Sequence, residues 1–560
     1  MKKVLKIGIF TESLKCREFR YDFYKWLKQK KNLEVYFLIK KPSLSTKVTF
    51  INRDPLINLT GLSPLQITSN LFYKAIFLLE KILIRKEIIF RKYFNKHDLL
   101  MVAENKTFLD LEASESTHTL STEDTFKVKS LELDLIFNFS EKEITFNDRQ
   151  VSKFGILSTR LYDEKSDFIG PPGFWEAYYK RDKIGYSLIQ SYDKSERKNI
   201  ISKGFFSTNE FYLSNKILLS IKSIALLKLF IDKILETGTL EILTSQESSN
   251  PIKYTYPNLI HILHYSIRLS KIILKRICNK FFFGQSGWSA NLKWNVSFTS
   301  RNWSSLDFKS GKTLPVPKNH FIADPFLIKK NGKIYCFVED FVYKKEKGHI
   351  SVYEIQNNDI KYLGKCLEEP FHLSFPFLFY YKNELYMCPE TSQKKQIRIY
   401  KCIDFPLKWE LASICINNIP AADTLLFEHQ SRWWMLTNID SAEINDHKCE
   451  LHIFSADSPL SSTWKPHKLN PIYIDPDVAR NAGLILEQGR IIRAAQKQAY
   501  NFYGKSLSLF EITKLNEYEF CEKLILKIDP TFKEDIIGTH HISSIDESTV
   551  IDHVSIRTVF

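Results

Sequence analysis

The chain has 560 residues, 44% of them hydrophobic, and a formal net charge of +15. This length exceeds what one hydrophobic core supports, so about two to four domains are expected, and the hydrophobic content excludes a disordered chain. The positive charge comes from Lys residues spread along the sequence, without zinc-finger spacing or an RNA-binding aromatic motif. Nucleic acid is therefore not the expected partner.

The nine cysteines are scattered and form no CxxC pair. Cys336, Cys388 and Cys402 lie inside apolar strand patterns, where a free thiol packs as a small hydrophobic group. The first residues contain neither a long apolar core nor a small-residue cleavage site, and no apolar run is long enough to span a bilayer. These features predict reduced cysteines and a cytoplasmic location.

Residues 1–240 alternate strand and helix patterns. Segments 4–13 and 33–41 predict strands around an amphipathic helix at 16–32, and a further helix is expected over 71–92. This βαβ rhythm predicts an α/β domain with a parallel sheet covered by helices. No GxGxxG follows the first strand, so the usual dinucleotide-binding fingerprint is absent.

Residues 241–295 are expected to form a helical linker. The segment 259–283 has apolar residues at helical spacing and carries Arg268, Lys271, Lys275, Arg276 and Lys280. An interdomain helix with one solvated face is the favoured interpretation. Peripheral contact with the inner face of a membrane is the alternative.

From residue 296 to 560 the pattern changes to strands, and an internal repeat emerges. Each copy reads strand, turn, strand, and the copies begin FIADPFLI (from Phe321), LSFPFLF (from Leu373), AADTLLF (from Ala421), RNAGLIL (from Arg480) and GTHHISSI (from Gly538). A spacing of roughly 50 to 58 residues is typical of propeller blades. The sequence therefore predicts an all-β, five-bladed β-propeller.

In a propeller the innermost strands face the axis, so equivalent polar residues from different blades are expected to converge. The candidates, in chain order, are Asp324, Glu339, His372, Glu390, Asp423, Arg480, Asn481, Arg493, Gln496, Tyr503, His540, His541 and Asp552.

Carboxylates in a shared, poorly solvated site can act as acid and base at sugar oxygens, so Asp324, Asp423 and Glu390 are the catalytic candidates. Asp324 or Asp423 could instead cap a turn. Arg480 and Arg493 are candidates for holding a phosphate or carboxylate. The remaining residues are candidate substrate-binding groups, and a structural role for the His540–His541 pair is favoured over metal binding.

Residues 321–552 resemble the propeller-like N-terminal domain of plant glucosamine inositolphosphorylceramide transferases and its bacterial relatives. The motifs that carry this resemblance are ADPFL, EEPFHLSFPFLF, YMCPET, ADTLLF, RNAG, RAAQ, YGKSLSL and GTHH. More remotely, the segment is similar to the five-bladed furanosidase clan of glycoside hydrolases, in which three carboxylates surround the axis. Asp324 matches the first-blade Asp of that clan, but Phe375 stands where many members have a second Asp, which argues against simple hydrolysis.

Residues 154–190 are similar to the formyltransferase fold and contain the loop GPPGFWE. Tetrahydrofolate-dependent formyltransferases have Asn and His where this chain has Ser158 and Arg160, and their Asp aligns loosely with Glu196. The resemblance thus implies that the loop shape persists while the proton shuttle and the oxyanion partner are missing.

Together these features predict a carbohydrate-active protein of cell-surface glycan biosynthesis, either a glycosyltransferase or its partner. Its substrate would be a carbohydrate or glycolipid, and its donor a sugar nucleotide or another activated sugar; no cofactor or metal is assigned. The alternatives are an N-formyltransferase that uses formyl-tetrahydrofolate on an amino sugar, and a non-catalytic glycan-binding protein. Glycoside hydrolysis ranks last.

Overall fold

The computed structural model describes residues 4–41, 64–84, 88–113, 117–140, 142–146, 151–161, 171–192, 197–240, 242–247, 257–283, 292–305, 308–356 and 359–556. The chain divides into two compact units, residues 1–271 and residues 272–560. Among the described helices, none has the length and apolarity needed to cross a membrane.

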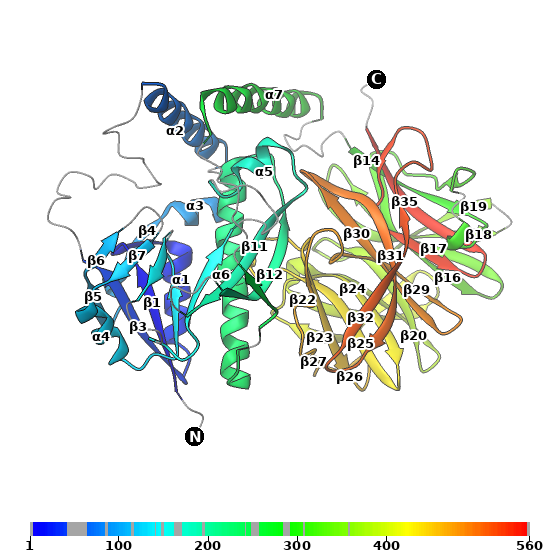
Figure 1. Ribbon diagram of the computed structural model, residues 1–560. Coiled ribbons are helices and arrows are strands. Elements are labelled where there is room, and N and C mark those ends of the chain that lie inside the picture. The colour runs from blue at the N-terminus through cyan, green and yellow to red at the C-terminus, as the bar shows by residue number, and fades with distance from the viewer. Residues whose placement is uncertain are drawn as a thin grey trace. The chain divides into compact units, whose positions relative to one another are not determined.

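The first unit is built around an eight-stranded sheet with the order β13-β12-β11-β10-β8-β1-β3-β5 (Figure 1). The parallel strands are β1 (Leu5–Thr11), β3 (Leu33–Lys40), β5 (Asn105–Leu109), β8 (Leu135–Asn138) and β10 (Ile156–Arg160). The antiparallel strands β11 (Lys183–Ser191), β12 (Arg197–Ser207) and β13 (Thr244–Glu247) extend one edge. The predicted parallel sheet is therefore confirmed for β1, β3, β5, β8 and β10, whereas the antiparallel edge was not predicted.

Smaller strands and helices complete this unit. The strands are β2 (Lys15–Arg17) with β4 (Lys96–Asp98), and β6 (Leu111–Ala113) with β7 (Thr117–Leu120) and β9 (Glu143–Thr145). The helices are α1 (Glu18–Lys28), α2 (Pro64–Ile84), α3 (Ile88–Phe94), α4 (Thr122–Lys129), α5 (Phe174–Tyr178) and α6 (Tyr212–Thr237), and the boundary at residue 271 falls within the last helix, α7 (Leu259–Phe283). The helix expected over 71–92 is thus present as α2 and α3.

Helix α1 illustrates how the apolar pattern determines packing in this unit. Its residues Tyr21, Phe23, Tyr24 and Leu27 are buried, and the ring of Tyr24 meets Phe37 of β3 edge-on at 5.3 Å between centroids. The helix therefore covers the sheet with the face that the sequence spacing identifies.

The second unit consists of five sheets. Counted from the innermost strand outward, the first sheet contains β16 (His320–Lys330), β17 (Lys333–Val342), β18 (Lys347–Gln356) and β19 (Asp359–Leu367), and the second contains β20 (Ser374–Tyr381), β21 (Glu384–Glu390), β22 (Gln396–Asp404) and β23 (Lys408–Asn417). The third sheet contains β24 (Ala421–His429), β25 (Arg432–Ile439) and β26 (Glu450–Ala456), which pairs with β27 (Lys465–Pro466) and β28 (Tyr473–Ile474), and the fourth contains β29 (Asn481–Glu487), β30 (Arg490–Ala499), β31 (Phe502–Leu515) and β32 (Phe520–Ile528). The fifth sheet contains β34 (Ile542–Ile545), β35 (Ser548–Ile556), β14 (Leu292–Thr299) and β15 (Lys312–Thr313), with β33 (Ile536–Gly538) paired to β35.

The innermost strands β16, β20, β24, β29 and β34 contact one another in a closed cycle, which is the arrangement of a five-bladed propeller. The last blade joins the two ends of the unit, because β14 pairs antiparallel with β35 from Leu292–Ile556 to Thr299–Thr549. Ring closure thus depends on β14, which begins four residues before the predicted boundary at 296.

The hairpin of β20 and β21 has the turn that its sequence requires. Lys382 and Asn383 at its tip both have positive φ, 50° and 62°. Two consecutive residues with positive φ are typical of the two-residue hairpin turn, because its backbone twist matches the twist of the two antiparallel strands that it joins. Behind the hairpin, Phe379 packs on Trp433 of the next blade with ring centroids 5.5 Å apart, so apolar side chains fill the space between blades.

Candidate axial site

Three innermost strands carry the same irregularity at the same place. Asp324 in β16, Phe375 in β20 and Asp423 in β24 have φ values of 49°, 48° and 49°. In each strand the pairing register breaks across this residue, which marks a β-bulge. Left-handed backbone at a non-glycine residue costs of order 1–3 kcal/mol and concentrates at functional sites. The bulges identify structurally equivalent positions and confirm that Phe375 stands where the other two blades have Asp.

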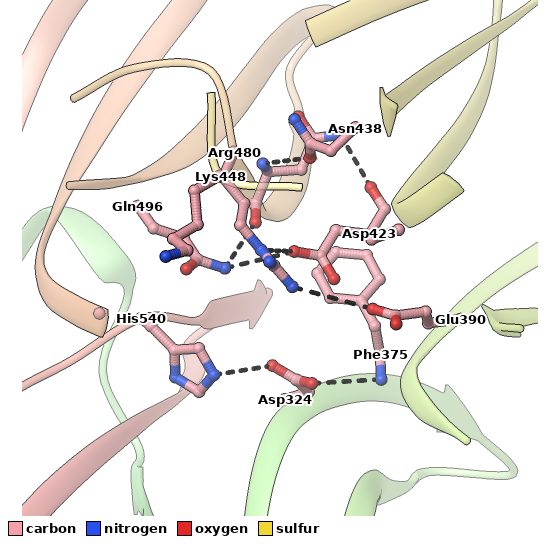
Figure 2. A network of polar contacts seen from close by, with 12 residues as sticks. Asp324, Phe375, Glu390, Asp423, Asn438, Lys448, Arg480, Gln496 and His540 are labelled. Atoms are coloured by element: carbon pink, nitrogen blue, oxygen red, sulfur yellow. Dashed lines mark hydrogen bonds and ion pairs between the residues drawn. The ribbon is translucent and has the colours of Figure 1, made fainter. Parts of the chain in front are cut away.

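Asp324 is buried and held on both sides (Figure 2). One carboxylate oxygen accepts a 3.2 Å hydrogen bond from the backbone N–H of Phe375, and the other lies 3.3 Å from Nε2 of His540. Burial raises the pKa of Asp324 to about 7, although the nearby His540 opposes the shift. This carboxyl group can therefore exchange a proton near neutral pH.

His540 is fixed by Asp552, which lies on β35. Nδ1 of His540 is 2.6 Å from Oδ2 of Asp552, and Oδ1 of Asp552 accepts the backbone N–H groups of His540 and His541 at 2.9 and 2.8 Å. Burial alone would lower the pKa of His540, but Asp552 and Asp324 outweigh it and raise that pKa. Trp294 of β14 covers the imidazole at 4.0 Å between ring centroids.

Asp423 is paired with the guanidinium of Arg480. Nε of Arg480 donates a 2.6 Å hydrogen bond to Oδ2 of Asp423, and Nε2 of Gln496 donates to the same oxygen at 3.3 Å. Another guanidinium nitrogen lies 3.8 Å from Glu390 (Figure 2). Burial raises the pKa of Asp423 to about 6, against the effect of Arg480.

Glu339 of β17 is the fifth acidic group of the cluster. Its carboxyl oxygen lies 3.5 Å from Nε2 of His372, whose Nδ1 accepts the backbone N–H of Gly348 at 2.8 Å. Burial, then the neighbouring charges of Asp324 and Glu390, raise the pKa of Glu339 well above its usual range. Burial also lowers the pKa of His372 to about 4, so its imidazole is neutral at physiological pH.

Tyr503 and Asn481 support the cluster. The guanidinium of Arg480 lies over the ring of Tyr503 at 5.0 Å, and that ring is 5.1 Å from the ring of His540. The side-chain amide of Asn481 donates to the backbone carbonyls of Asp423 and Leu436 at 2.8 and 3.0 Å. Tyr503 thus contacts both cations, while Asn481 holds the backbone that carries Asp423.

The charge of Arg493 and the ring of His541 are engaged outside the acidic cluster, although Arg493 also donates a 3.3 Å hydrogen bond to Oδ1 of Asn481. Arg493 is fully buried and forms a two-point ion pair with Glu522 of the outermost strand β32, at 2.9 and 2.6 Å. Its charge is therefore neutralised within blade four, which removes the predicted phosphate-binding role. The ring of His541 packs between Phe326 and Phe375, at 4.4 and 5.2 Å, and burial lowers its pKa to about 3.

The cluster carries an excess of acid. Its carboxyl groups belong to Asp324, Glu339, Glu390, Asp423 and Asp552, and its cations are Arg480 and His540. Side-chain exposure is greatest at His372 (24%), Arg480 (13%) and Glu390 (12%), so these groups are the most accessible from solvent. Such a site favours hydroxyl and ammonium groups of a ligand over a free phosphate.

Asp324, His540 and Asp552 offer atoms within 4.8 Å of one another, a spacing compatible with a metal ion. The oxygens of Asp552, however, already accept three backbone N–H groups, those of His540, His541 and, at 3.3 Å, Asp324. These donors satisfy Asp552 as part of the protein's own hydrogen-bond network.

Two residues of the site carried no sequence signal. Asn438 accepts the backbone N–H of Asn481 at 2.8 Å and donates to the carbonyls of Glu450 and Ala479 at 2.9 and 2.8 Å. Trp294 lies in β14, before the first recognisable repeat, so only ring closure brings it to His540.

In the first unit, Ser158 and Arg160 lie on β10, and Arg160 is 3.5 Å from Glu143. The loop before α5 ends at Gly173, whose φ of +87° suits glycine, and the following Phe174 is buried. Glu196 lies outside the described residues. The formyltransferase resemblance of this unit stays a prediction.

Residues 309–538 match the family model of the N-terminal region of glucosamine inositolphosphorylceramide transferase 1. The transferase of that name from rice, Oryza sativa subsp. japonica, is 35% identical over 209 residues, which are 36% of this chain and 28% of the relative. The one from Arabidopsis thaliana is 34% identical over 212 residues, 37% of this chain and 27% of the relative.

Among solved structures, the catalytic domain of the GH62 α-L-arabinofuranosidase of Coprinopsis cinerea aligns with a TM-score of 0.27 at 12% identity, covering 36% of this chain and 67% of that domain. The chain spans just over a quarter of the length of the plant relatives. The resemblance of the propeller to the N-terminal region of these transferases is therefore confirmed, and the matched residues 309–538 lie wholly within the second unit.

Proposed function

We propose that the propeller binds a sugar at the axial cluster and takes part in glycosyl transfer during glycan or glycolipid biosynthesis. The observation that carries this proposal is the convergence of carboxyl groups from four blades on two cations, with Asp324 and Asp423 on equivalent strained bulges. The family match of residues 309–538 to a named transferase supports it.

In the proposed reaction Asp324 is the general base. Its carboxylate takes the proton of an acceptor hydroxyl while that oxygen forms a bond to the anomeric carbon of an activated sugar. The bond to the leaving group breaks, and its electron pair departs with the leaving group. A pKa of about 7 matches this task, because the carboxylate is ionised in half the molecules at neutral pH and is basic enough to accept a proton.

Arg480 has a different role from the predicted phosphate clamp. Its guanidinium already pairs with Asp423 and lies near Glu390, so little of its charge is left for a departing phosphate. We assign it instead to positioning Asp423, whose free oxygen can then hold a sugar hydroxyl. The leaving group is expected to lie outside the acidic cluster.

The surplus of carboxyl groups points to the class of sugar. A protonated amine and several hydroxyls are the ligand groups that such a cluster satisfies best. The plant relatives are named for glucosamine and inositolphosphorylceramide, an amino sugar and a glycolipid. We therefore propose an amino sugar as the bound residue and an activated sugar, such as a sugar nucleotide, as its donor.

The test uses the purified full chain. Saturation-transfer NMR with methyl glucosaminide reports binding, and mass spectrometry of reactions containing uridine-diphosphate amino sugars and glycolipid acceptors reports transfer. Replacing Asp324 with Asn is expected to reduce transfer by about 10²–10⁴-fold. The matched control replaces Asp404, an exposed Asp of blade two, with Asn. Equal transfer by the Asp324 variant and the wild type would contradict the assignment.

A non-catalytic glycan-binding domain is the second candidate. It is favoured by the coverage of the match, because the shared segment is the N-terminal region of relatives that are more than three times as long as the aligned part. This candidate expects methyl glucosaminide to bind and the Asp324 and Asp423 variants to lose binding, with no product from any sugar nucleotide. Product formation by the wild type would exclude it.

A further inference from the structure

Helix α7 exposes a continuous apolar stripe. Its large apolar side chains that face solvent are Ile260, Leu263, Ile267, Leu274, Ile277 and Phe281. They are spaced three, four or seven residues apart, which places them on one side of the helix. Their exposed fractions range from 46% to 83%, whereas Ile262, Tyr265 and Leu269 on the other side are buried. The helix therefore has two apolar faces, of which the protein covers one.

Helix α2 repeats this pattern beside α7 (Figure 1). Its exposed residues are Leu71, Phe72, Leu78, Leu79 and Ile82. The two helices are joined by a buried hydrogen bond from Tyr265 of α7 to Glu80 of α2 and by a 3.1 Å bond from Ser69 to the carbonyl of Pro257. A row of large exposed apolar side chains along a helix, as on α7, indicates an interaction site.

The charges around this surface have one sign. Helix α7 contains no Asp or Glu, and the single acidic residue of α2 is Glu80, which is fully buried. The basic residues of the two helices are Lys74, Lys81, Arg268, Lys271, Lys275, Arg276 and Lys280. Helices that merely face water carry charges of both signs, so this bias requires a separate explanation.

We propose that the exposed side chains of α7, called here the helical face, bind the surface of a membrane that contains anionic lipids. Apolar side chains enter the boundary between headgroups and acyl chains, and flanking Lys residues meet the negative surface potential. The charges favour this occupant over a second copy of the chain, since two identical basic faces repel each other. The inference does not depend on the proposed function, because none of its residues belongs to the axial site.

The fold holds the helical face ready for this contact. Tyr265 and Glu80 anchor the inner sides of both helices, and Arg268 donates a 3.2 Å hydrogen bond to the carbonyl of Tyr178. The outer side of α7 can thus enter the headgroup region without unfolding of the unit. Neither helix is long and apolar enough to cross the bilayer, so the contact is peripheral.

The experiment is co-sedimentation of the full chain with extruded vesicles of phosphatidylcholine alone or with about one-third phosphatidylglycerol. One variant replaces Leu274, Ile277 and Phe281 with Glu; another replaces Lys271, Lys275 and Lys280 with Gln. All six side chains are exposed, so both variants are expected to fold. The control places Glu at Leu486 and Tyr518, two exposed apolar positions of the propeller.

The wild type and the control are expected to sediment with anionic vesicles and to be released by high salt. The Lys variant should partition about 100-fold more weakly, since each Lys near an anionic surface contributes roughly fivefold. The Glu variant should not sediment. The proposal is overturned if the wild type does not sediment with anionic vesicles or if all variants bind to them equally. It is also overturned if light scattering shows a wild-type dimer that is monomeric in the Glu variant.

Discussion

Within the axial site, Nε of Arg480 lies 2.6 Å from Oδ2 of Asp423, and this ion pair links blade four to blade three. Both side chains are almost completely enclosed. A buried ion pair stabilises a fold mainly through the penalty for breaking it, because the remaining charge is left without a partner. The pair therefore fixes the position of Asp423 and couples two blades at the axis.

Replacing Arg480 with Met is expected to lower the free energy of unfolding of the propeller by about 3–5 kcal/mol. Replacing Asp423 with Leu in the same chain should restore most of that loss, because Asp423 is then no longer left as a buried charge without a partner. Urea denaturation of the three variants measures both effects. The control pair Lys329–Asp546 also has a 2.6 Å contact but is largely exposed, and Lys329→Met should cost below about 1 kcal/mol. Equal losses at both sites would contradict the argument.

The second prediction concerns pH. Burial raises the pKa of Asp324 from 3.8 to about 7, so the proposed base is protonated below neutral pH. The rate of sugar transfer, as kcat/KM, should therefore fall about tenfold per pH unit below 7 and be constant above it. A profile that stays flat down to pH 5 would remove Asp324 from the role of base.

The same pKa shift predicts how stability depends on pH. The folded state binds the proton of Asp324 more tightly than the unfolded state does, so this group stabilises the protein less as the pH rises from about 4 to about 7. Asp324→Asn should remove this component of the slope while keeping the acceptor for the N–H of Phe375. Urea titrations at pH 5 and pH 8 compare the variant with the wild type.

The sequence was sufficient to predict the blades, because each repeat encodes its own apolar alternation and turn. Each repeat was predicted to read strand, turn, strand, and in the second repeat the structure has a tight turn with Lys382 and Asn383 at positive φ. The equivalence of Asp324, Phe375 and Asp423 also follows from aligned repeats, and the three bulges confirm it.

The hydrogen-bond and ion-pair partners of these site residues could not be predicted in this way. They depend on contacts between different blades, or between inner and outer strands of one blade. In the sequence of its repeat, Arg493 has no acidic residue nearby that would be expected to pair with it. In the structure its charge is neutralised by Glu522, which lies in the outermost strand β32, where the repeat has no recognisable motif. Asp552 was placed with the candidates, but only its position on β35 makes it the partner of His540. Trp294 reaches the site because the first strand of the unit closes the ring.

A third prediction tests ring closure at Gly483, on the innermost strand of blade four. A Cβ there would lie 2.0 Å from the carbonyl oxygen of Ile542 in blade five, and the φ of +126° also disfavours side chains. Gly364 has nearly the same φ, +129°, with no atom within 4 Å of such a Cβ. Gly364→Ala should cost about 1–2 kcal/mol for backbone strain alone, and Gly483→Ala roughly 1–3 kcal/mol more for the clash.

Urea denaturation separates the two contributions, since the backbone cost is common to both variants. If Gly483→Ala is no less stable than Gly364→Ala, blades four and five are not in close contact at this point.

The fourth prediction concerns Glu80, which anchors α2 to α6 and α7. It is fully buried, accepts the N–H of Leu213 at 2.7 Å and the hydroxyl of Tyr265, and burial raises its pKa to about 7. Because the folded state holds this proton more tightly than the unfolded state, the first unit should lose stability as the pH rises from 4.5 to about 7. The slope is about 1.4 kcal/mol per pH unit at most.

Thermal unfolding of Glu80→Gln and of the wild type between pH 5 and pH 8 tests this prediction. Gln keeps one acceptor oxygen for the N–H of Leu213, its amide nitrogen can donate to the hydroxyl oxygen of Tyr265, and it has no proton to lose, so the first unit of this variant should show a flatter pH dependence. Glu104→Gln is the control, because Glu104 is exposed and should leave the slope unchanged. A wild-type slope retained in Glu80→Gln would mean that another group titrates. A flat slope in both Glu80→Gln and Glu104→Gln would deny that burial of Glu80 distinguishes it from a surface carboxylate.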